Sequence, residues 1–342
     1  MTDKVHRVVQ WATGNIGRAS IRHMVENPAM DLVGVFVTNP DKVGKDAGEL
    51  AGIAEVGLAA TDDAEAILAL DADCVHFAPL VPDIDMVCRL LRSGKNVVSP
   101  VGPFYPTDYV REDVEKIEAA CREGGVSFHG SGIHPGFAGD ILPLTLARLT
   151  GRVDHVHVYE LVDFLAHPSP WMHRMGFGRD PEEIAANPSR PAETIHHFAQ
   201  SMAVIAEGLG KTIDGLSSET KFAVAQKDIP HPNGDIPAGT VAGQHYEWSA
   251  LTGGKPFITF HTIWVVGHEN VEPDWNHGDV RYRVTIDGEP SLELTLDDSR
   301  DGGSLTAFAG LTAIPAVCSA APGFVTQLDL GVVRPRGLVR PM

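Results

Sequence analysis

The pattern of hydrophobic and polar positions divides the chain into an alternating first part and a strand-rich second part. Apolar runs of strand length occur at 5–11, 32–37, 74–77, 96–99 and 126–128. Apolar residues at helical spacing lie between them, at 15–26, 62–70, 84–91 and 111–122. Strands that alternate with helices predict a Rossmann-type, doubly wound parallel sheet with right-handed crossovers.

After residue 151 the pattern changes to longer alternating strands with few helices between them. These strands are predicted at 153–162, 222–226, 239–250, 257–266, 280–286 and 291–296. They are typical of an α+β domain with a mostly antiparallel sheet that is open on one face. A helix at 304–320 and a closing strand or extended tail at 324–333 are expected to follow. The predicted domains are a dinucleotide-binding domain at 1–150, a substrate and dimerisation domain at 151–303, and a C-terminal helix and tail at 304–342 that returns toward the first.

The first strand runs directly into a glycine-containing turn and then a helix, which is the context of a dinucleotide phosphate loop. The turn follows the G-x-G-x-x-G pattern with alanine in the first position. Its glycines allow the backbone to approach a pyrophosphate, and the helix N-terminus offers N–H groups and a positive dipole. The residues expected to bind the cofactor here are Ala12, Thr13, Gly14, Asn15, Ile16 and Gly17.

The end of the second strand indicates which nicotinamide cofactor binds. A site for NAD usually has a carboxylate there, but this chain has Thr38 and Asn39, with Lys42 just beyond. These groups can donate to a 2′-phosphate, so we expect NADP, with NAD use also open; alternatively, Lys42 only faces solvent. Residues after the later strands are expected to contact the same cofactor: Ala78, Pro79, Pro100, Val101, His134 and Pro135.

Charge and composition exclude several other classes of function. The chain has 27 basic and 45 acidic residues and a net charge of −18, which disfavours nucleic-acid binding. No apolar run approaches the roughly 18 residues that cross a bilayer, and the first residues lack a signal-like apolar stretch. The four cysteines form no Cys-x-x-Cys pair. We therefore expect a cytoplasmic protein with reduced thiols and no membrane partner.

Two segments resemble known reductases. Residues 44–52, Gly-Lys-Asp-Ala-Gly-Glu-Leu-Ala-Gly, resemble a segment of dihydrodipicolinate reductases. Those enzymes hold their substrate with a Lys and a Ser-Gly-Thr-Ala run, whereas residues 130–140 here read Gly-Ser-Gly-Ile-His-Pro-Gly-Phe-Ala-Gly-Asp, without Lys. This run is more similar to the Gly-x-Gly-Val-Asn-Pro-Gly-Phe run of 2,4-diaminopentanoate dehydrogenase and the native amine dehydrogenases. That resemblance implies hydride transfer to or from an amine, with NADP-dependent reductive amination of a ketone or aldehyde as the reverse reaction.

The chain departs from the amine dehydrogenases at their proton-accepting glutamate. They place it just after the fourth strand, where residues 99–106 here read Ser-Pro-Val-Gly-Pro-Phe-Tyr-Pro. Tyr105 is a poor base at neutral pH. Either another group takes this role, Glu160 being the best carboxylate for it, or the substrate is not an amine.

Further site residues are expected at the end of the last strand of the first domain and in the second domain. His134 can exchange a proton during hydride transfer, or hydrogen-bond the cofactor's carboxamide as the relatives' Asn would, or serve only the fold. Pro135 is expected at the first helical position. The predicted substrate pocket comprises Phe137, Trp171, Phe177 and His261, each with core packing as its alternative.

The segment 164–193, rich in Pro, Gly and large apolar residues, is expected to be a lid over a hydrophobic substrate or an arm that contacts another subunit. The expected substrate is a small apolar carbonyl or amine. A homodimer through the open sheet face is expected. We predict no metal, because hydride transfer needs none and no histidines show ligand spacing such as His-x-x-Glu-His. The alternatives are a carbonyl or imine reductase that uses no ammonia and a non-catalytic NADP(H)-binding protein.

Overall fold

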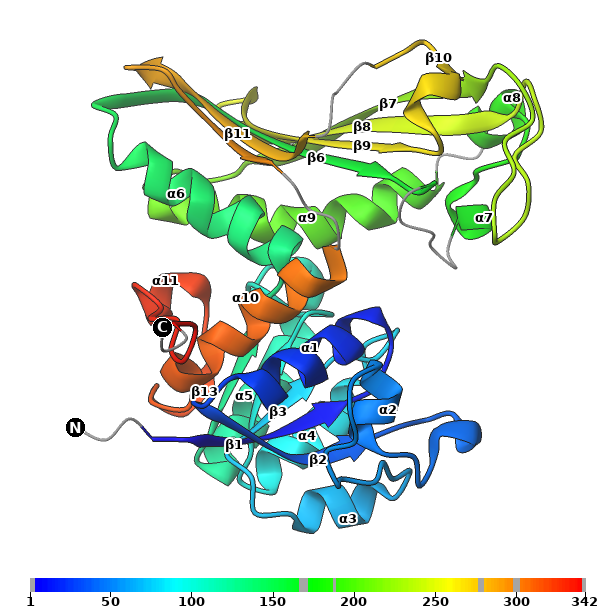
Figure 1. Ribbon diagram of the computed structural model, residues 1–342. Coiled ribbons are helices and arrows are strands. Elements are labelled where there is room, and N and C mark those ends of the chain that lie inside the picture. The colour runs from blue at the N-terminus through cyan, green and yellow to red at the C-terminus, as the bar shows by residue number, and fades with distance from the viewer. Residues whose placement is uncertain (1–3, 166–171, 187–188, 276–279, 298–301, 340–342) are drawn as a thin grey trace. The chain divides into compact units, whose positions relative to one another are not determined.

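The computed structural model describes residues 4–165, 172–186, 189–275, 280–297 and 302–339. The chain forms two compact units (Figure 1). Unit 1 comprises Met1–Phe137 and Gly302–Met342, and unit 2 comprises Ala138–Asp301. Unit 1 is therefore built from both ends of the sequence.

Unit 1 contains a six-stranded sheet in which all the strands are parallel. Its strands are β1 (His6–Trp11), β2 (Met30–Phe36), β3 (Cys74–Phe77), β4 (Asn96–Ser99), β5 (Ser127–Gly130) and β13 (Gly323–Phe324). They lie in the order β13-β5-β4-β3-β1-β2, so the strand order reverses between β1 and β3. The predicted doubly wound parallel sheet is confirmed.

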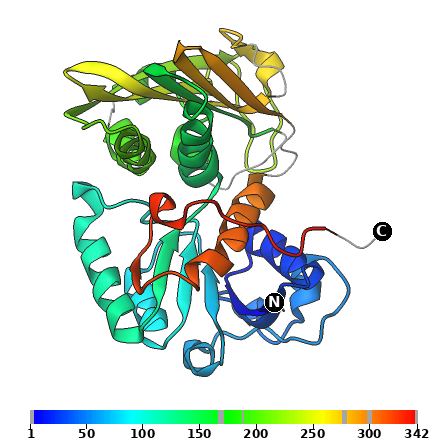
Figure 2. The ribbon, with the colours of Figure 1, turned by 90° about the vertical axis from the view of Figure 1, so that its left-hand side faces the viewer.

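Helices cover both faces of this sheet because its strands are apolar on both sides. Val9, on one face, belongs to a core with residues of α4 (Ile84–Arg92) and α5 (Arg111–Gly124). Val8, on the other face, packs with Met24 of α1 (Asn15–Glu26) and with α10 (Gly302–Val317). Figure 2 shows α5 on one side of the sheet and α1 and α10 on the other. The remaining short helices of this unit are α2 (Ala47–Ala51), α3 (Ala64–Ala69), α11 (Gln327–Leu330) and the 3-10 turns Pro40–Lys42 and Asp108–Val110.

Unit 2 contains a seven-stranded, mostly antiparallel sheet, as predicted. Its strands are β6 (Arg152–Asp163), β7 (Gly215–Ala225), β8 (Val241–Thr252), β9 (Lys255–Val265), β10 (Val271–Glu272), β11 (Val280–Glu289) and β12 (Leu292–Asp297). Their order is β10-β7-β8-β9-β6-β11-β12, and only β6 and β9 pair in parallel.

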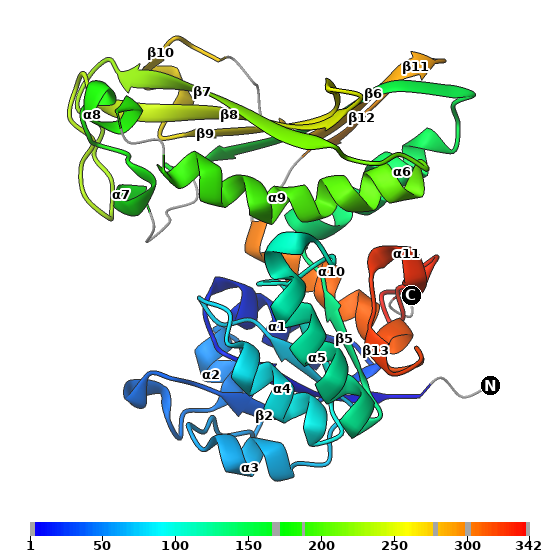
Figure 3. The same ribbon diagram turned by 180° about the vertical axis from the view of Figure 1, so that it is seen from behind.

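Two helices cover one face of the unit 2 sheet. They are α6 (Leu142–Ala147) and α9 (Ser189–Gly208), which lie along the same face (Figure 3). Phe198 and Met202 of α9 pack on Trp248 of β8 in the main core of the unit. Two shorter helices, α7 (Met172–Met175) and α8 (Pro181–Ala185), and a 3-10 turn at His268–Asn270 complete the described elements.

The structure corrects three predictions of local structure. The closing strand is only Gly323–Phe324, because a capping box between Thr326 and Asp329 begins α11. The helix α9 was not predicted. Pro135 does not begin a helix: Gly136 has φ 125°, so a left-handed backbone interrupts the π-helical segment Ile133–Ile141. In the described ranges, every helix falls short of the length and apolarity that a membrane crossing requires.

Candidate functional site

The turn between β1 and α1 has the backbone geometry of a phosphate-binding loop. Ala12 has φ 73° and is the one non-glycine residue with positive φ in the described part of the chain. A Cβ added to Gly17 would lie 2.1 Å from the carbonyl oxygen of Ala12, so only glycine fits. A Cβ added to Gly14 would meet nothing within 4 Å. Gly14 is the N-cap of α1 and offers no side-chain acceptor, which leaves the first amide groups of the helix for an anion.

A buried polar network that sequence reasoning missed supports this loop. Gln10, Ser20 and His76 are fully buried. The Gln10 Nε2 donates to the carbonyl oxygens of Trp11 at 3.1 Å and Ala12 at 3.0 Å. Its Oε1 lies 2.9 Å from Nδ1 of His76, so the ring must carry its proton on Nδ1 to donate. Burial lowers the pKa of His76 to about 4, which keeps the ring neutral.

Lys42 extends from the end of β2 to the phosphate loop. Its 3-10 turn, Pro40–Lys42, begins at Asn39, whose side chain accepts the N–H of Asp41. The Lys42 Nζ then donates to the carbonyl and hydroxyl oxygens of Thr13, both at 3.1 Å. Thr38 and Asn39 are exposed on the same segment. The structure thus brings one predicted cation to the predicted loop and places no carboxylate directly after β2.

The other predicted cofactor residues follow strands of the same sheet. Ala78 and Pro79 follow β3, Pro100 and Val101 follow β4, and His134 and Pro135 lie shortly after β5. Because all of these strands are parallel, their carboxyl ends share one edge of the sheet. Nucleotides bind at this edge in open parallel sheets, near the point where the strand order reverses.

Two of the predicted catalytic residues lie in unit 1, at or near this edge. His134 is half-buried, and Tyr105 is 9% exposed in the loop that follows β4. That loop packs closely against β5, since a Cβ on Gly130 would lie 2.2 Å from the Pro103 carbonyl oxygen. Phe137, predicted to line the pocket, is 39% exposed.

The segment 44–52, which carries the resemblance to dihydrodipicolinate reductases, is held together by Asp46. Its carboxylate accepts backbone N–H groups from Gly48 at 2.7 Å, Val56 at 2.9 Å and Gly57 at 2.8 Å. These bonds, that of Val56 foremost, lower the pKa of Asp46. Asp46 therefore organises this loop through its own backbone.

The third predicted catalytic residue, Glu160, lies in unit 2 on the helix-covered face of β6. Its side chain is 9% exposed and shares that face with Val156 and Val158 of the core. The Nε1–H of Trp264 donates to Oε1 of Glu160 at 3.1 Å. This bond fixes one oxygen of a buried carboxylate.

Among the predicted pocket residues of unit 2, His261 does not come together with Glu160. His261 pairs with Tyr159, the neighbour of Glu160 on β6, so it lies on the opposite face of the sheet. One pocket therefore cannot include both Glu160 and His261. Phe177 is fully buried in a separate core beside Phe164. Trp171 lies outside the described residues.

Known proteins match almost the whole chain in sequence. Residues 137–340 match the family described as 2,4-diaminopentanoate dehydrogenase C-terminal domain, and residues 6–101 match the N-terminal family of dihydrodipicolinate reductase. An amine dehydrogenase from Streptomyces virginiae is 33% identical, over 94% of this chain and 95% of its own. A 2,4-diaminopentanoate dehydrogenase from Acetoanaerobium sticklandii is 27% identical, over 73% of this chain and 70% of its own.

One solved structure supports the same fold. It is an amine dehydrogenase from Mycobacterium smegmatis, which superposes with a TM-score of 0.81 at 22% identity. The match covers 97% of this chain and 98% of that one, so both units have counterparts in a single known protein.

Proposed function

Since the chain belongs to the 2,4-diaminopentanoate dehydrogenase and amine dehydrogenase family, we propose that it interconverts a small apolar carbonyl compound and the corresponding amine with NADP(H). It is an NAD(P)-dependent oxidoreductase. The main structural support for this proposal is the loop between β1 and α1, which has the geometry of a phosphate-binding loop. There is open space at Gly14, and the Lys42 ammonium group donates to Thr13.

The residues of unit 1 fit a nicotinamide dinucleotide. The amide groups at the start of α1 would bind the pyrophosphate, and the Gln10 side chain holds the Ala12 carbonyl in place beneath it. When bound, the cofactor supplies or accepts the hydride. His134 would then exchange a proton with the substrate or hydrogen-bond the carboxamide, as the Asn of the relatives would.

We assign NADP preference to Lys42. A half-buried lysine that donates to a phosphate contributes about 1.5–3 kcal/mol, so Lys42→Ala should raise the Kd for NADPH about tenfold or more. The Kd for NADH, which lacks the 2′-phosphate, should change much less. Lys45→Ala is the matched control, because Lys45 pairs with Glu49 on the surface. Equal weakening of NADPH and NADH would refute the assignment.

We propose Glu160 as the group that accepts the proton of ammonium or of the amine. Glu160→Gln keeps the size and the acceptor for the Trp264 indole, but it cannot take a proton. Its kcat should fall about a hundredfold or more while the Kd for NADPH stays unchanged. Glu293→Gln, at an exposed carboxylate on β12, should retain full activity. A Glu160→Gln variant with unchanged kcat would exclude this role.

The two roles considered for His134, proton exchange and a hydrogen bond to the carboxamide, predict different outcomes for His134→Asn. Asparagine can donate the same hydrogen bond to a carboxamide but cannot exchange a proton near neutral pH. Retained activity would assign the carboxamide role, and a large loss of kcat with unchanged cofactor binding would assign proton exchange.

The deciding experiment measures NADPH oxidation against a panel of small aldehydes and ketones, with and without ammonium. Turnover that requires ammonium is expected. Turnover without ammonium would instead identify a carbonyl reductase, which the absence of a carboxylate in 99–106 specifically favours. NADPH binding without any turnover would identify a non-catalytic binding protein.

We also propose a homodimer, formed through the face of the unit 2 sheet that α6 and α9 do not cover. A sheet face that carries no helix offers a surface that a second subunit can contact. Light scattering should give a mass near twice the 36.7 kDa of one chain. A single-chain mass across a range of concentrations would contradict this.

A further inference from the structure

Several imidazoles gather on the face of the unit 2 sheet that α6 and α9 leave uncovered. His155 and His157 lie on β6, His245 and Glu247 on β8, and His261 on β9. His245 and Glu247 are two positions apart and so share a face, and Glu247 pairs directly with His261. The strand register alone therefore brings three potential metal ligands together.

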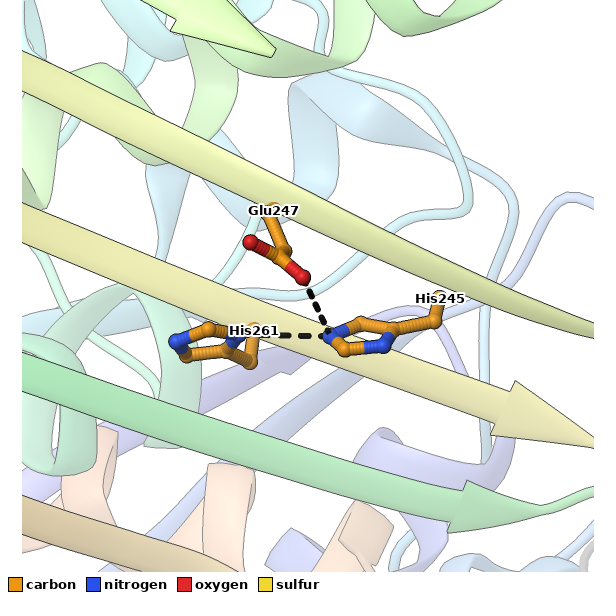
Figure 4. Close-up of side chains that lie close together, drawn as sticks. All are labelled: His245, Glu247 and His261. Carbon is orange, nitrogen blue, oxygen red and sulfur yellow. Dashed lines mark hydrogen bonds and ion pairs between the residues drawn. The ribbon is translucent and has the colours of Figure 1, made fainter. Parts of the chain in front are cut away.

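Three of these side chains converge at one point (Figure 4). The Nε2 of His245 lies 3.2 Å from Nδ1 of His261 and 3.8 Å from Oε1 of Glu247. One ligand atom from each residue lies within 4.8 Å of the other two. Around a tetrahedral zinc ion, with bonds of about 2.0–2.2 Å, ligand atoms are separated by about 3.3–3.6 Å. The separation of the two imidazole nitrogens is close to that range, and the Glu247 oxygen lies slightly beyond it from His245.

A chain of neighbouring groups directs one lone pair of His261 toward this point. The Nε2 of His261 lies 3.2 Å from Nδ1 of His157, and Nε2 of His157 lies 3.5 Å from a carboxylate oxygen of Asp287. Because that carboxylate can only accept, His157 carries its proton on Nε2 and accepts from Nε2–H of His261. The Nδ1 of His261 is then an acceptor facing His245 and Glu247. Histidine ligands are commonly oriented by such an outer group.

Ligation requires a change of tautomer at His245. Its Nε2 lies 3.2 Å from the accepting Nδ1 of His261 and so carries the proton, which must move to Nδ1 of His245 before Nε2 can bind a metal ion. Burial lowers the pKa of His261 to about 3 and also lowers the pKa of His245, so both rings are neutral. Burial raises the pKa of Glu247 and the hydrogen bond from Lys221 lowers it, and the net shift is downward.

One cation already competes for the glutamate. The Lys221 Nζ lies 2.7 Å from Oε1 of Glu247, and it also lies 3.4 Å from Glu219. The Lys221 side chain is 48% exposed, so it can move to Glu219 when another cation takes its place. Arg283, stacked over the Tyr159 ring at 4.0 Å, adds further positive charge nearby. Both residues lower the affinity of the cluster without blocking it.

We propose that His245, Glu247 and His261 bind one divalent transition-metal ion per chain, with Zn²⁺ preferred and water in the fourth position. Two imidazoles and a carboxylate form a donor set that suits zinc and not magnesium, which prefers oxygen ligands. The ion would link β8 to β9 on the face of the sheet opposite Glu160. The site does not depend on the proposed hydride chemistry.

The test titrates Zn²⁺ into tag-free, full-length protein that has been dialysed against a chelator. We expect one ion per chain with a micromolar or tighter Kd by competition with a chromophoric chelator. Mg²⁺ should not compete, and Co²⁺ should give the visible absorption of tetrahedral coordination. His245→Ala and His261→Ala should each raise the Kd at least tenfold. Absence of stoichiometric Zn²⁺ binding would overturn the proposal.

Matched variants separate ligation from folding. His155→Ala removes an imidazole on the same face that instead contacts Thr259 at 2.9 Å, so it should leave the Kd unchanged. Lys221→Met should tighten zinc binding, because it removes the competing cation without removing a ligand. Circular dichroism reports folding in every variant. Folded His245→Ala and Lys221→Met proteins that bind zinc like the wild type would refute the assignment.

Discussion

Ala12 has a left-handed backbone conformation, which its Cβ disfavours. With φ at 73°, its Cβ lies close to the following carbonyl oxygen, which costs about 1–2 kcal/mol relative to glycine. The phosphate loop maintains this conformation, because Gln10 Nε2 binds the Ala12 carbonyl and Gly17 lies directly against it. An alanine at the first position of the motif therefore stores strain in the loop.

Ala12→Gly should consequently stabilise unit 1. Removing the Cβ relieves the strain, while the extra freedom of glycine in the unfolded chain offsets part of the gain, so the net increase should be about 0.5–1 kcal/mol. Denaturant unfolding measures it. Ala119→Gly, within the regular helix α5, is the control and should lower stability by about 1 kcal/mol. A loss of stability in Ala12→Gly as well would mean that the left-handed conformation carries no strain.

At the scale of elements, β5 is joined to the C-terminal segment by a buried histidine. The Nδ1 of His129 lies 2.7 Å from the carbonyl oxygen of Val325, and Ser127 Oγ donates to the carbonyl of Ala321 at 3.0 Å. Burial lowers the pKa of His129 to about 4, although the Val325 carbonyl opposes this shift. The ring is therefore neutral in the folded protein well below the pH at which it gains a proton in the unfolded chain.

This difference predicts acid destabilisation in a defined window. The unfolded chain protonates His129 below its ordinary pKa of 6.5, whereas the folded chain does so only near 4, so stability falls with pH between these values. At about pH 5 the loss due to His129 should be about 2 kcal/mol relative to neutral pH. Guanidinium unfolding at both pH values measures it. His129→Gln should lose about that much less on acidification, and an equal loss in both proteins would contradict the prediction.

The elements that the sequence predicts best are those whose apolar residues recur at regular spacing and are buried in the core. Strands β1 to β5 and helices α1, α4 and α5 all show this pattern. The residues Ile195, Phe198 and Met202 of α9 also have helical spacing, but the preceding Pro- and Gly-rich segment favoured a lid or arm. The bounds of the two-residue strand β13 were not predicted, because they depend on its pairing with β5 and on the packing of Phe324 against Phe128.

The sequence predicts the parts of the candidate site that lie within one short stretch of the chain. It does not predict the parts that the fold brings together from separate strands. The predicted phosphate loop follows from one contiguous pattern and Lys42 from its position after β2, whereas the Gln10 and His76 network joins residues on β1 and β3 that only the sheet brings together. The cluster of His245, Glu247 and His261 depends on the register of β8 and β9. A signal for that register existed: Gly253 and Gly254, both with positive φ, form the two-residue turn of this hairpin.

At the scale of the whole molecule, unit 1 is completed by the last part of the chain. Leu311, Ile314 and Val317 of α10 are fully buried in a core with Val8 and Met24. Beyond α10, β13 adds a strand to the edge of the sheet, and Asn27 Nδ2 donates to the carbonyl of Arg336 at 3.0 Å. Each buried side chain of this size contributes about 1.5–3 kcal/mol. Those of α10 together therefore approach the whole stability of an ordinary domain.

A chain that ends at residue 301 should therefore lose NADPH binding although it retains the entire phosphate loop. Without α10 the apolar face of β1, β3 and β4 is exposed, so unit 1 should unfold or aggregate, which circular dichroism and size-exclusion chromatography would detect. A chain that ends at Gly337 is the matched control. It keeps α10, β13 and the Asn27 contact and should bind NADPH like the full chain. If the shorter chain stayed folded and bound NADPH, the core formed by α10 would be dispensable, and residues 4–137 would suffice for the nucleotide-binding unit.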